Sequence, residues 1–274
     1  MAVVESDNQE YINSILDKDS FSQKDIITIL KSGITLSDYK DKLIGKTVYL
    51  YNSTDYRPYY ISPNSCQYVI ADINHQDKHD DSSSYTPNSI DLIASGIVCV
   101  RNFGSISPYG GRWSTSDIRI WLNDTFKNGF DNEIQELMSQ MIVESYVPFT
   151  TLQTSDILPA VNNNTTDYVK LLSDTELNLS TYDKCMSEIE GTPYSDIFTS
   201  DAYDSSNTSR IKGYDVSYSG GYVLWTRSIN FNNTDRVWSV SILGNCKYNN
   251  LCISNYGVVP VLRLKDKKEA KYDR

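Results

Sequence analysis

The stretch GYVLWTRSINFNNTDRVWSVSILGNCKYNNLCISNYGVVPVLRL, residues 221–264, decides the fold class. Apolar runs of strand length alternate with polar turns rich in Asn and Tyr, and the stretch closes on VVPVLRL. Such alternation is typical of a β-rich domain. Two tryptophans and two arginines lie in its first half, and they are compatible with a binding surface, an active site or core packing. The rest of the chain has to decide between these readings.

Composition narrows the class of protein. The chain has 274 residues, of which 39% are hydrophobic, so it can form one large domain or a domain with a small attachment. Its net charge of −10 argues against binding nucleic acid or anionic membranes. Five cysteines without a CxxC pair indicate neither a complete disulfide framework nor a zinc ribbon. The N-terminus carries no signal-peptide pattern and no run is long enough for a membrane span, so we expect the chain to be made in a cytoplasm and not exported by the usual route.

Three regions follow from the pattern along the chain. Residues 1–45 predict a small helical N-terminal segment, in which Ser22 and Asp25 form a capping box. This segment cannot form a core alone, so it docks either on the main domain or on another protein. Residues 46–266 predict one α+β domain with short strands and long loops, and residues 267–274 a charged tail.

Within the main domain, polar residues mark expected helix starts. Ser114 is expected to cap a helix that carries Trp121, and Asp131 a second helix. Ser173 with Glu176 predicts a third cap. The run HQDKHDDSSSYTPNS, residues 75–89, predicts a long solvated loop.

Four sequence blocks carry a resemblance: SDIRIWLND, VKLLSDTE, LWTRS and GVVPVLRL, in this order within about residues 66–264. This order resembles an uncharacterised family of C-type-lectin-like domains from gut bacteria and their phages. The resemblance implies an α+β fold with two helices, a twisted antiparallel sheet and long loops that carry the binding surface. Trp121 then lies inward on the first helix, and Gly257–Leu264 forms the last strand. Trp225 and Arg227 lie on a central strand, where Arg227 binds a carboxylate or carbonyls beneath the loops.

The sequence offers little support for a metal site. The Glu/Gln-Pro-Asn/Asp loop and the Trp-Asn-Asp strand that hold Ca²⁺ in sugar-binding C-type lectins are absent. The oxygen donors of residues 72–81 lack the turn glycine and the distal Glu of a calcium loop, so we expect a solvated loop there. They are Asp72, Asn74, Asp77, Asp80 and Asp81. His75 and His79 have metal-ligand spacing for a helix but lie in a loop-like run. We therefore expect no metal and no cofactor.

An enzyme is not expected either. His75 and His79 are the only histidines, and no nucleophile elbow, P-loop or dinucleotide fingerprint occurs. Formylglycine-generating enzymes share the C-type-lectin-like fold and use cysteines near the C-terminus, which Cys246 and Cys252 resemble. The strand after Gly257, which would hold the reactive cysteine, contains none. An oxidase of that kind stays open as an alternative.

The loops of the opening stretch are the expected ligand-binding surface. Tyr, Asn and Ser together are typical of adaptable binding surfaces. The candidate residues are Asn230, Asn232, Asn233, Tyr248, Asn249, Asn250 and Tyr256. Trp121, Trp225 and Arg227 are expected to be framework.

The expected function is that of a non-enzymatic phage virion protein that recognises a host-surface glycan or protein. Residues 1–45 would contact other virion proteins, and a homo-oligomer is compatible with that setting. Assembly in the host cytoplasm and release by lysis would explain the lack of a signal peptide. The alternative is a structural decoration protein of the capsid or tail, which contacts virion proteins only.

Overall fold

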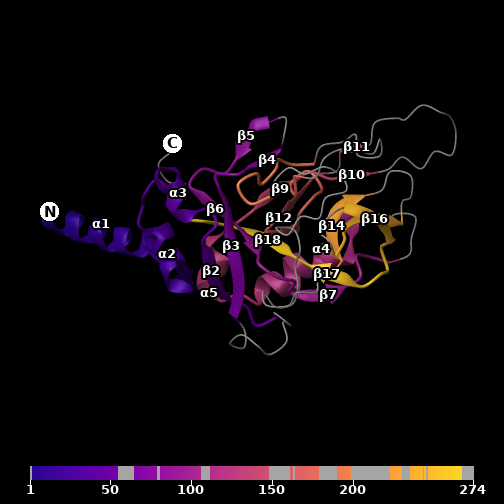
Figure 1. The fold of residues 1–274 in the computed structure, drawn as a ribbon, viewed down its shortest axis with the longest axis horizontal. Helices are drawn as coiled ribbons and strands as arrows, with labels where there is room; N and C mark the ends of the chain where they lie inside the picture. The colour runs from indigo at the N-terminus through magenta and orange to yellow at the C-terminus, as the bar shows by residue number, and fades with distance from the viewer. Residues whose placement is uncertain are drawn as a thin grey trace.

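The computed structural model describes residues 2–54, 65–78, 81–105, 112–147, 161–162, 164–178, 190–198, 223–229, 235–242, 244 and 246–266. Helices and sheets are mixed along the chain, which confirms the α+β class. A seven-stranded sheet lies in the middle of the view, with the N-terminal helices on one side and a five-stranded sheet on the other (Figure 1).

The N-terminal segment forms three α-helices, a short 3₁₀ helix and one strand. These are α1 (Ala2–Leu16), β1 (Ser20–Ser22), α2 (Gln23–Lys31), η1 (Leu36–Tyr39) and α3 (Lys40–Leu43). The predicted capping box is confirmed, because the Ser22 hydroxyl accepts from the Asp25 N–H while the Asp25 carboxylate accepts from the Ser22 N–H. Strand β1 pairs in parallel with β2, so the segment docks on the main domain. Its buried Phe21 and Ile26 belong to the same core as Leu264.

The seven-stranded sheet has the order β1-β2-β3-β6-β18-β13, and β8 also pairs with β18. Its further strands are β2 (Thr47–Tyr51), β3 (Ser65–Ile73), β6 (Ser89–Ala94), β8 (Met138–Ser139), β13 (Val169–Leu171) and β18 (Pro260–Lys265). All its pairs except β1–β2 are antiparallel. Directly paired residues share a face, and neighbours along a strand alternate between faces.

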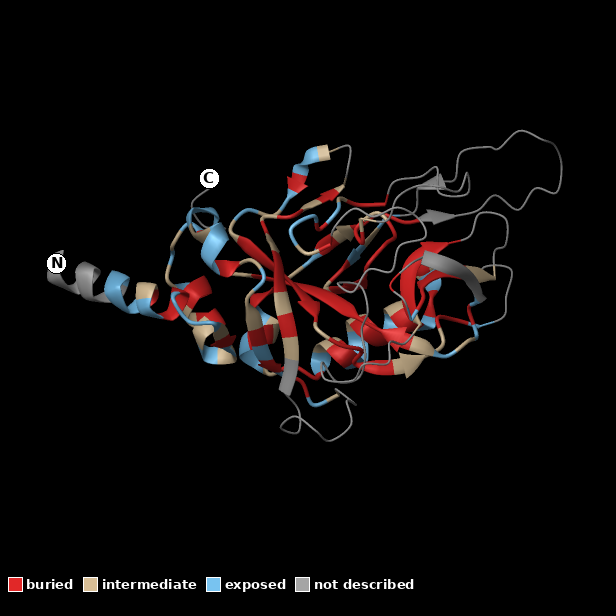
Figure 2. Ribbon diagram, viewed as in Figure 1, coloured by how far each residue is buried: buried red, intermediate tan, exposed pale blue. Residues whose placement is uncertain are grey.

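The two faces of this sheet differ in chemistry. On the apolar face, Ile70 pairs with Leu92 and Leu92 with Leu262, and all three belong to the core that also contains helix residues. On the polar face, Asp91 pairs with Arg263 and Lys170 with Val261. Asp91, Lys170 and Arg263 are completely buried, so the polar face is covered as well (Figure 2).

The five-stranded sheet has the order β16-β15-β14-β17-β7. Its strands are β7 (Cys99–Arg101), β14 (Leu224–Ile229), β15 (Arg236–Val240), β16 (Cys246–Leu251) and β17 (Tyr256–Val258). Strand β14, with Trp225 and Arg227, is central. A Cβ atom on Gly257 would lie 2.5 Å from Ile97 Cγ2, so only glycine allows β17 this close approach. Residues 257–264 therefore form two strands, β17 and β18, in different sheets, where a single last strand was expected.

Short helices connect the sheets: η2 (Trp113–Thr115), α4 (Asp117–Trp121), η3 (Leu122–Phe126, a π-helical turn) and α5 (Asn132–Leu137). The prediction that Ser114 caps the helix that carries Trp121, α4, is wrong. Ser114 lies in η2, and the hydroxyl of Ser116 accepts the Arg119 N–H at 3.2 Å. The short η2 turn displaces the start of α4 by two residues. Asp131 caps α5 as expected, because its carboxylate accepts the Ile134 N–H.

Three two-stranded ribbons complete the fold. They are β4 (Gln76–Lys78) with β5 (Asp81–Tyr85), β9 (Met141–Val143) with β12 (Thr165–Asp167), and β10 (Tyr146–Val147) with β11 (Val161–Asn162). The expected solvated loop at 75–89 is therefore a hairpin, and its His75 and Asp77 are buried. Within the described part of the chain, no helix has the length and apolarity needed to cross a membrane.

Candidate functional site

A buried polar network lies on the polar face of the seven-stranded sheet. We use this name for seven residues, each at most 2% exposed: Asp77, Asp91, Lys170, Glu176, Tyr194, Arg227 and Arg263. They come from five strands, from the turn after β13 and from the segment 190–198. Three carboxylates face three cations, so the network is balanced in charge.

Glu176 is the centre of one end of the network. The turn that follows β13 positions it, because the Ser173 hydroxyl accepts from the Glu176 N–H at 3.0 Å and Glu176 Oε2 accepts from the Ser173 N–H at 3.1 Å. This is the predicted capping box, although it closes a turn and not a helix. Lys170 Nζ lies 2.7 Å from Glu176 Oε1, and the Arg227 guanidinium donates to both carboxylate oxygens.

The charges around Glu176 keep it ionised. Burial alone would raise the pKa of Glu176, but Arg227 and Lys170 lower that pKa to about 2. Burial opposes the charge of Arg227 in the same way, and Glu176 more than compensates, so the pKa of Arg227 is raised. A pKa this low is poorly matched to general acid–base catalysis near neutral pH.

Arg227 makes the contacts that were expected of it. Its Nε donates to the Glu144 carbonyl at 3.1 Å, Nη1 to the Leu171 carbonyl at 2.8 Å, and Nη2 to the Glu190 carbonyl at 3.3 Å. Together with its two bonds to Glu176, these contacts use all five guanidinium N–H groups. Arg227 thus joins β14 to the chain after β9, to β13 and to the start of the segment 190–198.

Arg263 is the centre of the other end. Its Nε and Nη2 donate to the two carboxylate oxygens of Asp91 at 2.5 and 2.9 Å. Nη2 also lies 2.9 Å from Asp77 Oδ1, and Nη1 donates to Thr86 Oγ1 at 3.1 Å. Although burial opposes both charges, the pKa of Asp91 is lowered and the pKa of Arg263 is raised by this pairing. The hairpin of β4 and β5 is thereby tied to the sheet.

Tyr194 connects the two ends. Its hydroxyl donates to Asp91 Oδ2 at 2.8 Å, and Lys170 Nζ lies 5.8 Å from its ring centroid. Burial, followed by the charge of Asp91, raises the pKa of Tyr194 well above its usual value. The phenol therefore stays neutral and donates its proton, and the segment 190–198 is held over the polar face.

The four sequence blocks meet around this network. In the first block, Asn123 accepts from the backbone N–H groups of Tyr168 and Val169 and donates to the Val169 carbonyl, which fixes β13 against the helix. The Arg119 guanidinium pairs with the buried Asp167 at 2.7 Å. The second, third and fourth blocks supply Glu176, Arg227 and Arg263. The blocks therefore build the frame of the domain.

The structure describes the side chains of the three expected framework residues, and of Tyr256 among the expected ligand residues. Trp121 is buried on α4 beneath Arg101, and Trp225 is buried with its indole N–H donating to the Arg101 carbonyl. Asn230, Asn232 and Asn233 lie outside the described residues. Tyr248, Asn249 and Asn250 lie on β16, the outer strand of its sheet, and only their backbone is described. Tyr256 is half-buried, with its ring 4.8 Å from that of Trp225, so it packs on the frame.

The described residues that were considered as metal ligands form ion pairs and hydrogen bonds within the fold. Asp77 pairs with Arg263 and accepts the Ile142 N–H, and Asp72 accepts from His75. Asn74, with φ of 59°, accepts the Ser89 N–H, while His79 and Asp80 lie outside the described residues. Across the described ranges, no group of three or more His, Cys, Asp or Glu side chains is arranged to hold a metal ion.

The described cysteine near the C-terminus is not activated. Cys252 is buried, its thiol donates to the Ser105 carbonyl at 3.2 Å, and burial raises its pKa. Reactive cysteines instead have a lowered pKa and access to solvent. The side chain of Cys246 lies outside the described residues.

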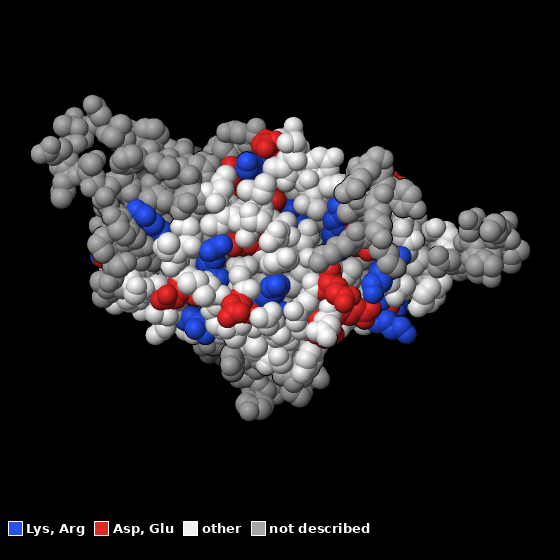
Figure 3. Space-filling view, turned by 180° about the vertical axis from the view of Figure 1, so that it is seen from behind, with Lys and Arg blue, Asp and Glu red and all other residues white. Residues whose placement is uncertain are grey.

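The charges on one face of the molecule are mixed. Figure 3 shows Lys and Arg side chains interspersed with Asp and Glu over the described part of this face. A surface that binds nucleic acid gathers cations into a patch or stripe. The described part of this face has no such patch.

Residues 93–266 match the family described as a domain of unknown function, DUF6273. The chain belongs to the DUF6273 family. No curated protein and no solved structure matches the chain. The DUF6273 region begins inside β6 and ends just after β18, so it contains the four sequence blocks and most of the polar network.

Sequence reasoning found Glu176 and Arg227 but missed Asp91, Tyr194 and Arg263. The strands SIDLIA and PVLRLK place Asp91 and Arg263 between apolar residues. A charged side chain on a buried strand requires a partner of opposite charge, so the sequence could have indicated that Asp91 and Arg263 pair. Tyr194 had none, because its neighbours form no regular pattern.

Proposed function

We propose that this chain is a non-enzymatic phage virion protein whose C-type-lectin-like domain recognises a glycan or protein on the surface of a gut bacterium. The observation that carries the proposal is the saturated guanidinium of Arg227. With all five N–H groups used inside the frame, Arg227 and its partner Glu176 hold the chain together and are not free for chemistry.

The frame supports recognition by fixing where the connections begin. Arg227 fixes β14, and the chain from Asn230 to Asn233 directly follows that strand. Strand β16, with Tyr248, Asn249 and Asn250, lies at the outer edge of the same sheet. Tyr248, Asn249 and Asn250 thus lie at the edge of this sheet that is farthest from β7. Tyr256 is excluded from this set because it packs on Trp225.

Binding of the purified protein to intact gut bacteria and to a glycan array tests this function. The variant carries Asn232→Ala, Asn233→Ala, Tyr248→Ala and Asn249→Ala. Its matched control carries Tyr49→Ala and Tyr51→Ala, two exposed tyrosines on β2 in the other sheet. We expect the first variant to lose binding and the control to keep it. Absence of binding by the unchanged protein to any cell or glycan would remove the recognition function.

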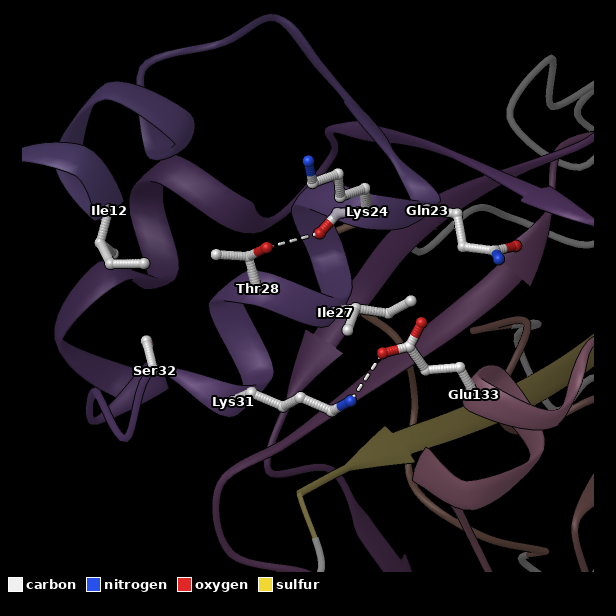
Figure 4. A pocket seen from close by; sticks show the side chains of 8 residues that line it. All are labelled: Ile12, Gln23, Lys24, Ile27, Thr28, Lys31, Ser32 and Glu133. Atoms are coloured by element: carbon white, nitrogen blue, oxygen red, sulfur yellow. Dashed lines mark hydrogen bonds and ion pairs between the residues drawn. The ribbon is translucent and has the colours of Figure 1, made fainter. Parts of the chain in front are cut away.

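Structural decoration of the particle is the second candidate, and the N-terminal helices favour it. Helix α1 extends away from the body in Figure 1, which suits an attachment to another virion protein. A groove of about 670 Å³ lies beside it between α1, α2 and α5, lined by Ile12, Gln23, Lys24, Ile27, Thr28, Lys31, Ser32 and Glu133 (Figure 4). Particles assembled with the Lys24→Glu variant separate the two functions. If the variant protein is lost from the particles, the groove is an attachment site. If the particles keep the variant protein but adsorb less to cells, the result contradicts attachment through this groove.

A further inference from the structure

His75 follows β3 directly and is 2% exposed. Its ring stacks on that of Tyr194 with the centroids 3.9 Å apart and the planes at 10°. Both ring nitrogens have a polar partner: Nδ1 lies 2.9 Å from Asp72 Oδ2, and Nε2 lies 3.0 Å from Thr192 Oγ1. The imidazole thus lies between the sheet and the segment 190–198.

The proton of the Thr192 hydroxyl is already used. Thr192 Oγ1 lies 2.6 Å from the Gln76 carbonyl oxygen, which can only accept. A hydroxyl has one proton, so Thr192 donates to Gln76 and must accept from His75 Nε2. His75 Nε2 therefore carries a proton.

The partner of Nδ1 is a carboxylate. Asp72 Oδ1 accepts the Ile73 N–H at 2.7 Å and lies 3.4 Å from Lys40 Nζ. Burial opposes ionisation, but the hydrogen bond to the His75 ring, the hydrogen bond from the Ile73 N–H and the charge of Lys40 lower the pKa of Asp72 below its usual value. An ionised carboxylate only accepts, so Nδ1 must donate as well.

The charged groups around His75 are of both signs. Asp91 lies on the neighbouring strand β6 and acts on His75 through space. Arg263 donates to the His75 backbone carbonyl at 3.2 Å, but it is neutralised by two carboxylates. The titratable or charged groups near this ring are Lys40, Asp72, Asp77, Asp91, Lys170, Tyr194 and Arg263. The aromatic face of Tyr194 favours a cation.

We infer that His75 is a buried imidazolium that latches the segment 190–198 to the sheet, with one N–H on Asp72 and the other on Thr192. A neutral imidazole has a single N–H and can serve only one of these two acceptors. The proton on His75 therefore joins β3, the hairpin of β4 and β5, and the segment that carries Tyr194. This device is independent of the proposed recognition function.

Nitrogen NMR of the His79→Gln variant tests the charge directly, because His75 is then the only histidine of the chain. At pH 7 we expect both ring nitrogens to be protonated, each coupled to its own ring proton. One nitrogen in the unprotonated range, which marks a neutral ring, would overturn the imidazolium.

Two substitutions at Thr192 test the latch. Thr192→Ser keeps the hydroxyl that accepts from His75, whereas Thr192→Val removes it with little change in volume. We expect hydrogen exchange at the Tyr194 and Phe198 amides to be about tenfold faster in Thr192→Val than in Thr192→Ser, because a buried donor loses its partner. Equal exchange in the two variants would show that the imidazolium does not hold the segment. Should Thr192→Val not fold, the NMR result on the His79→Gln variant still decides the charge.

Discussion

The two faces of the seven-stranded sheet are both buried, yet they hold the fold in different ways. The apolar face carries Ile70, Leu92 and Leu262, whose packing is non-directional. The polar face carries Asp91, Lys170 and Arg263, whose bonds require defined partners at defined distances. An aliphatic face can stabilise several arrangements of a covering loop, whereas directional ion pairs and hydrogen bonds favour one.

The difference explains why irregular segments lie on the polar face. The turn after β13 and the segment 190–198 contain no long helix or strand that could place them by regular hydrogen bonding. Glu176, Tyr194 and the Glu190 carbonyl supply that placement instead. A buried ion pair contributes little net stability over an apolar replacement, but removal of one partner is costly. The polar face is thus expected to be sensitive to single changes.

Arg227→Met is expected to have the largest effect. It leaves Glu176 with only Lys170 to compensate its charge and three backbone carbonyls without their donor. We expect the free energy of unfolding to fall by about 3–5 kcal/mol, measured by urea denaturation at pH 7. Arg227→Met combined with Glu176→Leu is the control and should lose less than the single variant. If Arg227→Met alone lowers the free energy of unfolding by less than about 1 kcal/mol, the polar face is not the more sensitive of the two faces.

Leu262→Ala measures the apolar face at the position beside Arg263. Deletion of a fully buried leucine side chain is expected to cost about 3 kcal/mol, through lost burial and the cavity that remains. Urea denaturation should show a lower midpoint with an unchanged slope. A changed slope would mean that the apolar face also determines which arrangement the chain adopts.

Lowering the pH is expected to weaken the polar face and not the apolar face, because only the polar face carries groups that titrate. The pKa of Glu176 is lowered from 4.5 to about 2 in the folded chain, so its contribution is fully present above pH 4.5 and is lost as the pH falls toward 2. The size of this contribution is about 3 kcal/mol. The difference in unfolding free energy between the unchanged chain and Glu176→Gln should shrink across this window. A constant difference down to pH 2 would contradict the assignment.

Gly191→Ala tests the closeness of the segment 190–198 to Glu176. Gly191 has φ of 83°, and a Cβ there would lie 2.6 Å from Glu176 Oε1. Gly45→Ala is the matched control, because Gly45 has φ of 80° but open space around it. We expect a loss of about 1 kcal/mol in the control from backbone strain and about 2 kcal/mol more at Gly191. Equal melting temperatures would show that the segment moves aside freely.

Lys31→Ala is expected to have the smallest effect. The pair of Lys31 and Glu133 joins α2 to α5 at 2.7 Å, but both side chains are exposed to solvent. Exposed pairs contribute at most about 1 kcal/mol and are screened by salt. A loss as large as that of Arg227→Met would mean that burial is not what makes the polar face sensitive.

Local signals in the sequence predicted a good part of the frame. The caps at Ser22, Asp131 and Ser173 were readable because a capping side chain acts within three residues of its target. Ser114 was misassigned because η2 intervenes and Ser116 offers the same chemistry two residues later. Trp225 and Arg227 lie on the central strand of their sheet, as the family resemblance implied.

Long-range contacts account for what the sequence did not reveal. His75 and Asp77 lie in a run that is polar throughout, so nothing marked them as buried by Arg263 and Tyr194, more than 100 positions away. The sequence left open whether the N-terminal segment docks on the main domain for the same reason. Strand β1 pairs with β2 only after the chain has passed through α2, η1 and α3.

That pairing has a practical consequence for any shortened form of the protein. Strand β1 is three residues long and shields the outer edge of β2, whose sequence TVYLY is strongly strand-forming. Cleavage near residue 45 would leave the backbone N–H and C=O groups of β2 without a neighbour, beside the exposed rings of Tyr49 and Tyr51. A bare edge of this kind invites strand addition between molecules. Trimmed forms that begin at β2 would therefore precipitate more readily than a chain that keeps residues 1–45.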